Sequence, residues 1–284
     1  MSMTSPLVER SRIEYARRNC PTAIRDPQKI VKEAIEKHGD KLAVSCSFGS
    51  CSVVVLHMAL QMKPDIKVVF NNTGVEYPET YEYRDLLAKA WNLNLVETKP
   101  EKSFWECVKE YGFPLIRSEY AWKKDKRKQL KPMCCIFLKE KPMAKACREY
   151  NIEASLTGLR CAESGVRMFV IAQRGQIYHT KKWGSLWRYH PIAFWTKAEV
   201  DQYLWDHQIP KNTIYSKGKD RSGCMPCTGF LNWERQLARA NPKMYRIVQK
   251  MRGVPILDNY LQWEDRLIAT CEPREAVKQM EESS

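Results

Sequence analysis

Four of the eleven cysteines stand in two close pairs that suit metal chemistry. Cys134 and Cys135 are adjacent, and Cys224 and Cys227 form a Cys-Met-Pro-Cys motif. A Cys-x-x-Cys pair brings two sulfurs toward one point, and four thiolates in a tetrahedral arrangement bind zinc or an iron–sulfur cluster. Adjacent cysteines are unusual for structural zinc, whose ligands are normally about two to four residues apart. The residues alone leave open an iron–sulfur cluster, a zinc ion or free buried thiols.

A serine-rich loop is the second candidate site, and it reads Ser-Phe-Gly-Ser-Cys-Ser over residues 47–52. Small residues between a strand and a helix let backbone N–H groups approach an anion, and the helix N-terminus adds partial positive charge. The hydroxyls of Ser47, Ser50 and Ser52 are further donors. The loop lacks the Gly-Lys-Ser/Thr ending of a Walker motif. A phosphate loop and a tight turn with a serine cap both remain open at this point.

Two arginines form the third candidate site, in the segment that follows an expected strand at 153–159. Arg160 and Arg167 offer guanidinium groups that bind phosphate or sulfate in a bidentate manner. Glu163 lies between them and could orient one of them. The alternative is a cluster of surface ion pairs.

The elements that must position these residues alternate between strand and helix. Short apolar strands are expected at 41–47, 66–72, 92–99 and 153–159, and helices at 52–62, 78–91, 103–112 and 136–150. Strands joined by helices favour an α/β fold, with a parallel Rossmann-like sheet covered by helices on both faces. Beyond residue 165 the pattern loosens into extended segments at 175–180 and 186–195 and helices at 196–208 and 232–253. We expect a nucleotide-binding domain over 1–180 and a helical C-terminal extension over 181–284.

The charge favours a polyanionic partner, because 47 basic and 33 acidic residues give a formal net charge of +14. Aromatic residues lie among basic ones in 181–235 and suit either nucleic-acid contact or the core of this region. They are Trp183, Trp187, Tyr189, Trp195, Trp205 and Trp233. The basic run Lys123–Lys131 is either a loop over a substrate or a solvated surface.

No apolar run approaches a membrane span and the sequence starts without a signal peptide, so we expect a cytoplasmic protein with no membrane partner.

Three segments together resemble the pyrophosphate-loop adenine-nucleotide-binding proteins, and most closely the phosphoadenosine-phosphosulfate (PAPS) reductase family. They are the Ser-Phe-Gly loop, Asn72-Thr73-Gly74 with Pro78-Glu79-Thr80, and the run from Gly158 to Arg167. Cys51 stands where an acidic or amide residue is usual, and Asn72 stands where Asp is usual. The resemblance implies an adenine nucleotide alpha hydrolase-type fold and a set of nucleotide-binding residues. This set comprises Ser47, Phe48, Gly49, Ser50, Ser52, Thr73, Gly74, Gly158, Arg160, Glu163, Ser164 and Arg167, of which Ser47, Arg160 and Arg167 are the catalytic candidates.

The cysteine pattern also has a counterpart in this family. Adenosine-phosphosulfate (APS) reductases, and the sulfurtransferase of DNA phosphorothioation, hold a [4Fe-4S] cluster with the same four-cysteine arrangement. By that resemblance Cys134, Cys135, Cys224 and Cys227 are the cluster ligands.

The first functional hypothesis is an ATP pyrophosphatase that acts as a sulfurtransferase. ATP, with Mg²⁺ to offset its charge, would be cleaved to activate a nucleic-acid acceptor, most plausibly DNA, and a partner cysteine desulfurase would supply the sulfur. Cys46, Cys51 and Cys161 lie beside the phosphate loop in this hypothesis, and the sequence does not choose among them as sulfur carrier.

The alternative is a thioredoxin-dependent reductase that converts APS or PAPS to sulfite. Such reductases use a C-terminal cysteine in a Glu-Cys-Gly-Leu-His segment, whereas Cys271 stands here in Thr-Cys-Glu-Pro. A third hypothesis is a non-catalytic iron–sulfur subunit that binds nucleic acid. The sequence leaves open whether the protein forms a homo-oligomer.

Overall fold

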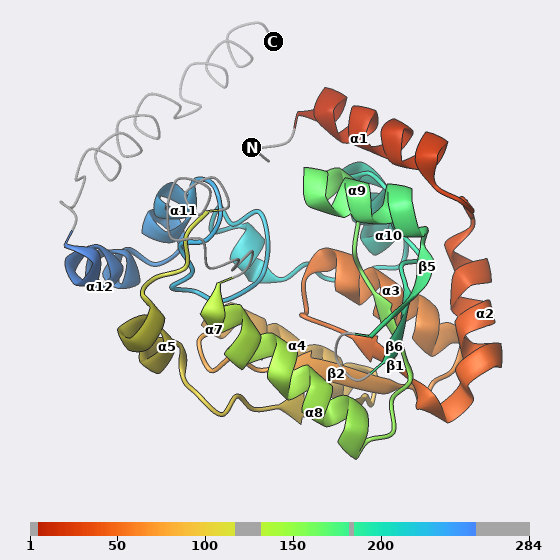
Figure 1. Cartoon of the computed structure of the whole chain (residues 1–284), viewed down its shortest axis with the longest axis horizontal. Coiled ribbons are helices and arrows are strands. Elements are labelled where there is room, and N and C mark those ends of the chain that lie inside the picture. The colour runs from red at the N-terminus through yellow and green to blue at the C-terminus, as the bar shows by residue number, and fades with distance from the viewer. Residues whose placement is uncertain (1–4, 117–131, 182–184, 254–284) are drawn as a thin grey trace, which may run out of the picture.

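The computed structural model describes residues 5–116, 132–181 and 185–253, and its centre is a six-stranded sheet (Figure 1). The strands are β1 (Leu42–Ser45), β2 (Lys67–Asn71), β3 (Asn94–Thr98), β4 (Ala154–Thr157), β5 (Ile177–Thr180) and β6 (Leu186–Tyr189). Their order across the sheet is β3-β2-β1-β4-β6-β5. All neighbouring pairs are parallel except β5 with β6, which is antiparallel. The expected α/β fold is therefore confirmed, with one antiparallel edge strand.

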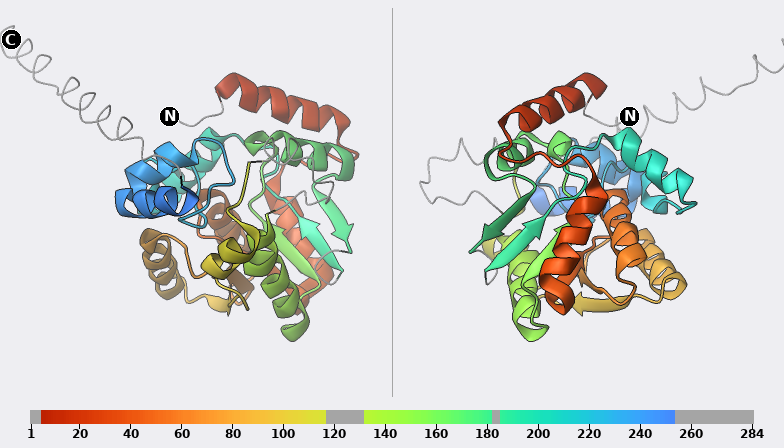
Figure 2. Two further views of the ribbon diagram at one scale, coloured as in Figure 1. Left: turned by 60° about the vertical axis from the view of Figure 1, so that its left-hand side comes forward. Right: turned by 90° about the vertical axis from the view of Figure 1, so that its right-hand side faces the viewer.

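Helices cover both faces of the sheet (Figures 1 and 2). They are α1 (Pro6–Asn19), α2 (Pro27–His38), α3 (Ser50–Met62), α4 (Pro78–Ala90), α5 (Phe104–Tyr111), α7 (Met133–Cys135), α8 (Lys141–Glu149), α9 (Gly165–Arg174), α10 (Lys197–Asp206), α11 (Trp233–Ala240) and α12 (Pro242–Arg252). Short turns of 3₁₀-helix lie at Gly39–Lys41, Cys161–Glu163 and Thr213–Tyr215. A π-helical turn, Ile136–Glu140, joins α7 to α8.

Alternate strand residues divide the core between the two faces. Leu42, Val44 and Val68 pack with apolar residues of α2, α3, α4 and α10. Ala43 and Val69 point the other way and pack with Met143 of α8. This period of two is what a parallel strand buried on both faces requires.

The strand order creates a switch point at the centre of the sheet. From β1 the chain moves outward through β2 to β3, and it then returns to place β4 on the other side of β1. Connections leave β1 and β4 in opposite directions, so a crevice opens at the carboxyl ends of these two strands. The loops that follow β1 and β4 are the serine loop and the arginine segment, and they therefore adjoin.

The C-terminal part of the described chain forms a smaller apolar cluster of its own. Trp233 and Leu237 of α11 pack with Tyr245 and Val248 of α12 and with Tyr77, which precedes α4. β6 lies inside the sheet although it follows the expected boundary at residue 180. The division at that residue stays a prediction. No helix in the described residues is long and apolar enough to cross a membrane.

Candidate functional site

The serine loop turns tightly from β1 into α3. Phe48 has φ 53°, in the left-handed region, and its side chain is fully buried against Phe70. What Phe48 presents to a ligand is thus its backbone. Ser52 closes the loop from inside, because its hydroxyl donates to the Gly49 carbonyl at 2.9 Å and lies 3.3 Å from the Ser47 amide. Ser47 itself is exposed.

The loop after β4 is pressed against this turn at Gly158. A Cβ atom at Gly158 would lie 2.5 Å from the carbonyl carbon and oxygen of Cys51 and 2.6 Å from the Ser52 nitrogen. Real Cβ atoms essentially never approach backbone this closely. Glycine is therefore required because two backbone segments touch at the crevice.

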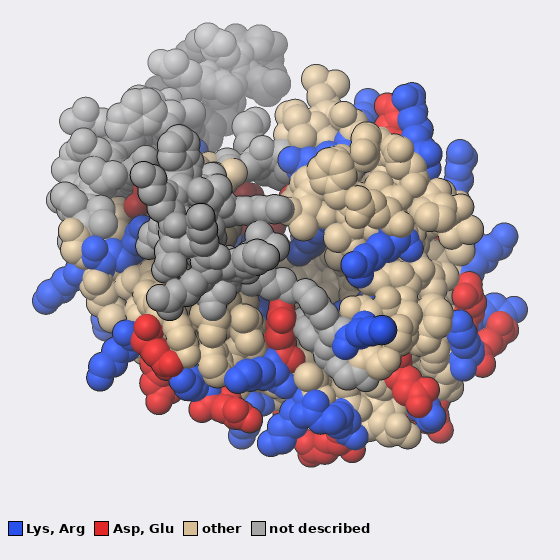
Figure 3. All heavy atoms as spheres, in the orientation of Figure 1, with Lys and Arg blue, Asp and Glu red and all other residues tan. Residues whose placement is uncertain are grey.

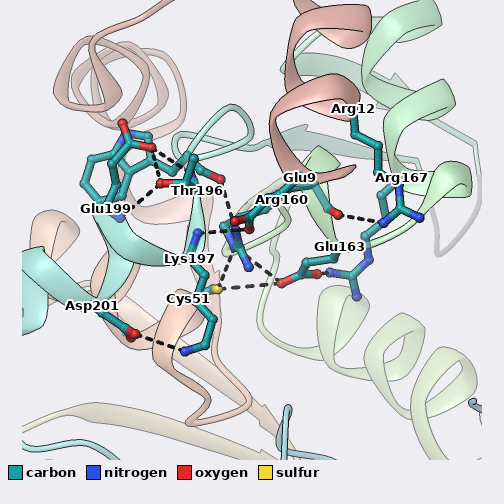
Figure 4. Close-up of polar contacts among 12 residues, drawn as sticks. Glu9, Arg12, Cys51, Arg160, Glu163, Arg167, Thr196, Lys197, Glu199 and Asp201 are labelled. Carbon is teal, nitrogen blue, oxygen red and sulfur yellow. Dashed lines mark hydrogen bonds and ion pairs between the residues drawn. The ribbon is translucent and has the colours of Figure 1, made fainter. Parts of the chain in front are cut away.

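Arg160 anchors the arginine segment (Figure 4). Its Nε donates to the Cys51 sulfur at 3.2 Å, and its Nη1 donates to the Trp195 carbonyl at 3.0 Å. Glu163 pairs with Arg167 and lies 3.6 Å from the Nε of Arg160. The two cations share Glu163 beside the serine loop, and Arg160 also pairs with Glu9 of α1. Guanidinium groups of this kind can bind an anion through paired N–H donors.

Thr73 and Gly74 follow β2 at the same edge of the sheet. The Gly74 amide donates to the Asn72 side chain at 2.8 Å, with φ 74° at Gly74. The buried Thr73 hydroxyl donates to Glu76 at 2.9 Å and accepts from the Cys224 thiol at 3.5 Å. This segment thus links the nucleotide-binding candidates to one of the predicted metal ligands.

All four predicted cysteine ligands line a single pocket. Cys134 and Cys135 reach it from α7, and Cys224 and Cys227 reach it from a turn in which the Cys227 amide donates to the Cys224 carbonyl at 3.2 Å. Backbone pairing between Glu76 and Cys224 fixes this turn against the segment after β2. Two distant stretches of sequence are thereby brought together.

Cations surround the cysteine pocket. Lys139, Lys219 and Arg221 line it with the four thiols. Burial raises the pKa of Cys224 to about 12 and also raises the pKa of Cys227. A hydrogen bond from the Cys134 thiol lowers the pKa of Cys135, helped by Lys139 and Arg221. The neighbouring cations would offset the negative charge of a metal bound by thiolates.

The cysteine pocket and the serine loop are in contact. Ser222, which lines the pocket, has its hydroxyl 3.4 Å from the hydroxyl of Ser47. The hydroxyl of Tyr215 accepts from the Ser50 amide at 3.0 Å. Burial, followed by the charge of Arg221, lowers the pKa of Arg167 to about 10. The anion site and the cysteine site are thus neighbouring parts of one region.

Comparison with known proteins agrees with this geometry. The sequence profile of the phosphoadenosine phosphosulfate reductase domain matches residues 41–230, which include the serine loop, the arginine segment and all four cysteines. The chain belongs to the phosphoadenosine phosphosulfate reductase family.

Curated relatives in this family are named adenosine 5'-phosphosulfate reductases. The one from Geobacillus kaustophilus is 30% identical over 203 residues, which cover 70% of this chain and 77% of the relative. The one from Staphylococcus epidermidis is 30% identical over 201 residues, which cover 70% and 75%. A phosphoadenylyl-sulfate reductase from Candida auris, solved as a phosphate complex, has the same fold at a TM-score of 0.53 and 22% identity, over 70% of this chain and 88% of that one.

The four cysteines predicted as metal ligands can be tested by the chemistry of their surroundings. Four soft sulfur donors and three nearby cations are suited to a zinc ion or an iron–sulfur cluster. In the described residues no group of three or more Cys, His, Asp or Glu side chains is already arranged as a closed metal site. The donor chemistry therefore fits a metal or cluster bound by thiolates.

The predicted aromatic surface is largely core. Tyr189 and Trp233 are buried, Trp187 and Trp195 are partly buried, and within the described residues of this set only Trp205 is exposed. On the face in Figure 3, Lys and Arg are interspersed with Asp and Glu. Trp183, the run Lys123–Lys131 and Cys271 lie outside the described residues.

The three thiols beside the serine loop differ in access. Cys46 and Cys161 are buried, and burial raises the pKa of each to about 11. Cys51 is partly exposed and contacts Arg160.

Sequence reasoning missed Glu9, whose carboxylate contacts Arg160 from α1. Nothing local in a helical, polar N-terminal segment indicates such a role.

Proposed function

We propose that this protein is a reductase of an adenylyl sulfate, either APS or PAPS, and that it releases sulfite. The observation that carries the proposal is the contact between Ser47 and Ser222, because it joins the anion-binding loop to the four-cysteine pocket. The family membership and the printed names of the curated relatives support the same activity.

The described residues would bind and orient the nucleotide. Backbone N–H groups of the serine loop, together with the N-terminus of α3, would receive the phosphate. Arg160 and Arg167, which pair with Glu9 and Glu163, would bind the phosphate and sulfate groups of the nucleotide together with this loop. In the reaction a cysteine thiolate attacks the sulfate sulfur, an S–S bond forms, and the S–O bond breaks to release AMP from APS or adenosine 3',5'-bisphosphate from PAPS. A dithiol protein such as thioredoxin then reduces the S–S bond, and sulfite leaves while the dithiol becomes a disulfide.

The cofactor that we propose for the cysteine pocket is a [4Fe-4S] cluster held by Cys134, Cys135, Cys224 and Cys227. Such a cluster supplies an anionic centre whose reduction potential depends on nearby charge and hydrogen bonds. Lys139, Lys219 and Arg221 supply the charge, and Thr73 is already placed to contact the sulfur of Cys224.

A second candidate is an ATP pyrophosphatase that transfers sulfur to nucleic acid. The context of Cys271, Thr-Cys-Glu-Pro, favours it, because it differs from the C-terminal cysteine segment that the reductase hypothesis requires. The net charge of +14 also suits a polyanionic acceptor better than a small nucleotide. In this case Mg²⁺-bound ATP would occupy the serine loop, and a cysteine desulfurase would donate the sulfur.

One assay separates the two candidates. Protein purified without oxygen is given APS, PAPS or ATP, with thioredoxin and its reductant, and sulfite and pyrophosphate are measured. Sulfite from either sulfonucleotide supports the reductase, whereas pyrophosphate from ATP without any sulfite refutes it. Arg160→Gln should abolish the observed activity, and Arg18→Gln, at an exposed ion pair on α1, should leave it unchanged.

A further inference from the structure

Glu9 joins three elements at the arginine segment (Figure 4). One of its carboxylate oxygens, Oε1, accepts from Nη1 of Arg160 at 2.7 Å. The same oxygen accepts from the backbone amide of Lys197, the first residue of α10, at 3.0 Å. Glu9 belongs to α1, which precedes the segment matched by the family profile at 41–230.

The contact is shielded from solvent. The side chain of Arg160 is 8% exposed and that of Glu9 is 15% exposed. A charge-assisted hydrogen bond is stronger in such surroundings than an ion pair on the surface. Glu14 and Arg18 on the same helix form a pair of the surface kind, with side chains 61% and 74% exposed.

The contacts of Arg160 leave one part of its guanidinium group available. Nε donates to Cys51, and Nη1 donates to Glu9 and to the Trp195 carbonyl. The described residues give the remaining nitrogen, Nη2, no hydrogen-bond partner. The contacts of Nε and Nη1 therefore fix the orientation of the guanidinium group, and both N–H donors of Nη2 can bind a ligand.

α1 packs directly against the arginine segment and α9. Ile13 and Ala16 are buried with Ile171 of α9 and with Phe194. Arg12 donates to the Ala162 carbonyl at 2.9 Å, inside the arginine segment. A carboxylate carried by such a helix acts as a fixed support for Arg160.

Without the Glu9 charge, Arg160 has another carboxylate within reach. Its Nε already lies 3.6 Å from Glu163, which is paired with Arg167. Rotation of Arg160 onto Glu163 would turn Nη2 away and would compete with Arg167 for the same carboxylate. Both cations of the anion site would then be misplaced.

We propose that Glu9 is a positioning residue that orients Arg160 for the anionic group of the bound nucleotide, so that α1 is part of the nucleotide site. The inference rests on the proposed function only in taking the ligand of Arg160 to be the phosphate or sulfate of an adenine nucleotide.

The test measures binding of adenosine, AMP and APS by calorimetry to wild type, Glu9→Gln and Glu14→Gln. Loss of a hydrogen bond to a charged group should weaken AMP and APS by about tenfold or more in Glu9→Gln. Adenosine should bind all three proteins equally, because it lacks the anionic group. A merely structural role would weaken adenosine as well, so the ratio of AMP to adenosine affinity is the decisive readout.

Glu9→Asp and a double-mutant cycle with Arg160→Lys complete the test. Glu9→Asp keeps the charge and should recover part of the lost AMP affinity, and it serves as the test variant if Glu9→Gln does not fold. In the Arg160→Lys background Glu9→Gln should have little further effect. Unchanged or tighter AMP binding in Glu9→Gln refutes the inference alone, whereas wild type that binds none of the three ligands refutes the proposed function as well.

Discussion

Gly158→Ala tests the contact between the two loops that form the crevice. The added Cβ would lie 2.5 Å from the backbone carbonyl of Cys51, whereas ordinary contact begins at 3.4 Å. One of the two backbones must therefore move by roughly the difference, 3.4 − 2.5 = 0.9 Å. Neither has a flexible side chain at the contact that could absorb the shift.

The expected cost is that of overpacking a tight contact, about 1–3 kcal/mol of unfolding free energy. In a protein of this size each kcal/mol lowers the midpoint of thermal unfolding by about 2–4 °C. The binding free energy of the nucleotide should fall as well, because a displacement of about 1 Å in a binding site misplaces the groups that contact the ligand. We expect AMP to bind at least about tenfold more weakly.

Thermal unfolding followed by circular dichroism and AMP binding by calorimetry provide the measurements. Gly165→Ala is the matched control, since a Cβ at the first residue of α9 meets nothing within 4 Å. It should keep wild-type affinity and equal or slightly raise the unfolding midpoint, because alanine favours a helix over glycine. A Gly158→Ala protein with wild-type midpoint and affinity would show that the loops do not touch as described.

Two further predictions concern the cysteine pocket and a buried histidine. Protein prepared without oxygen should contain iron and sulfide and absorb visible light, and Cys224→Ser should lose both the cluster and the absorbance. Cys147→Ser, at a buried residue of α8 outside the pocket, should keep them, and colourless wild type would contradict the cluster. Burial, then Arg188 and Arg167, lower the pKa of His190 from 6.5 to about 3. Below pH 6.5 this histidine therefore binds a proton in the unfolded chain but stays neutral in the folded protein. The free energy of unfolding should fall between pH 6.5 and pH 3 by up to about 1.4 kcal/mol per pH unit. In urea unfolding at pH 7, 6 and 5, His190→Gln should lose this dependence, and an unchanged slope would refute the assignment.

The strands and the three candidate sites were accessible from sequence because each has a local cause. A short apolar run rich in β-branched residues, such as 66–72, favours a buried strand, and the predicted segment overlaps β2 at Lys67–Asn71. The strand order could not be predicted, since β4 and β3 have equally short apolar runs and nothing local says which lies beside β1. The same limit applies to β6, which follows the boundary expected at residue 180 but lies inside the sheet.

The sequence by itself determined the chemistry of this protein: the sulfur donors, the small-residue loop and the guanidinium groups are fixed by residue type. Tertiary structure decided which of them meet. Cys134 and Cys224 reach one pocket, Gly158 touches Cys51, and Glu9 supports Arg160, because later strands are added on the other side of β1 and α1 packs beside the loop after β4. The chemistry of a side chain is fixed by its own covalent structure. These contacts instead depend on the combined burial of many apolar side chains that lie far apart in the sequence, so they cannot be predicted from any short segment.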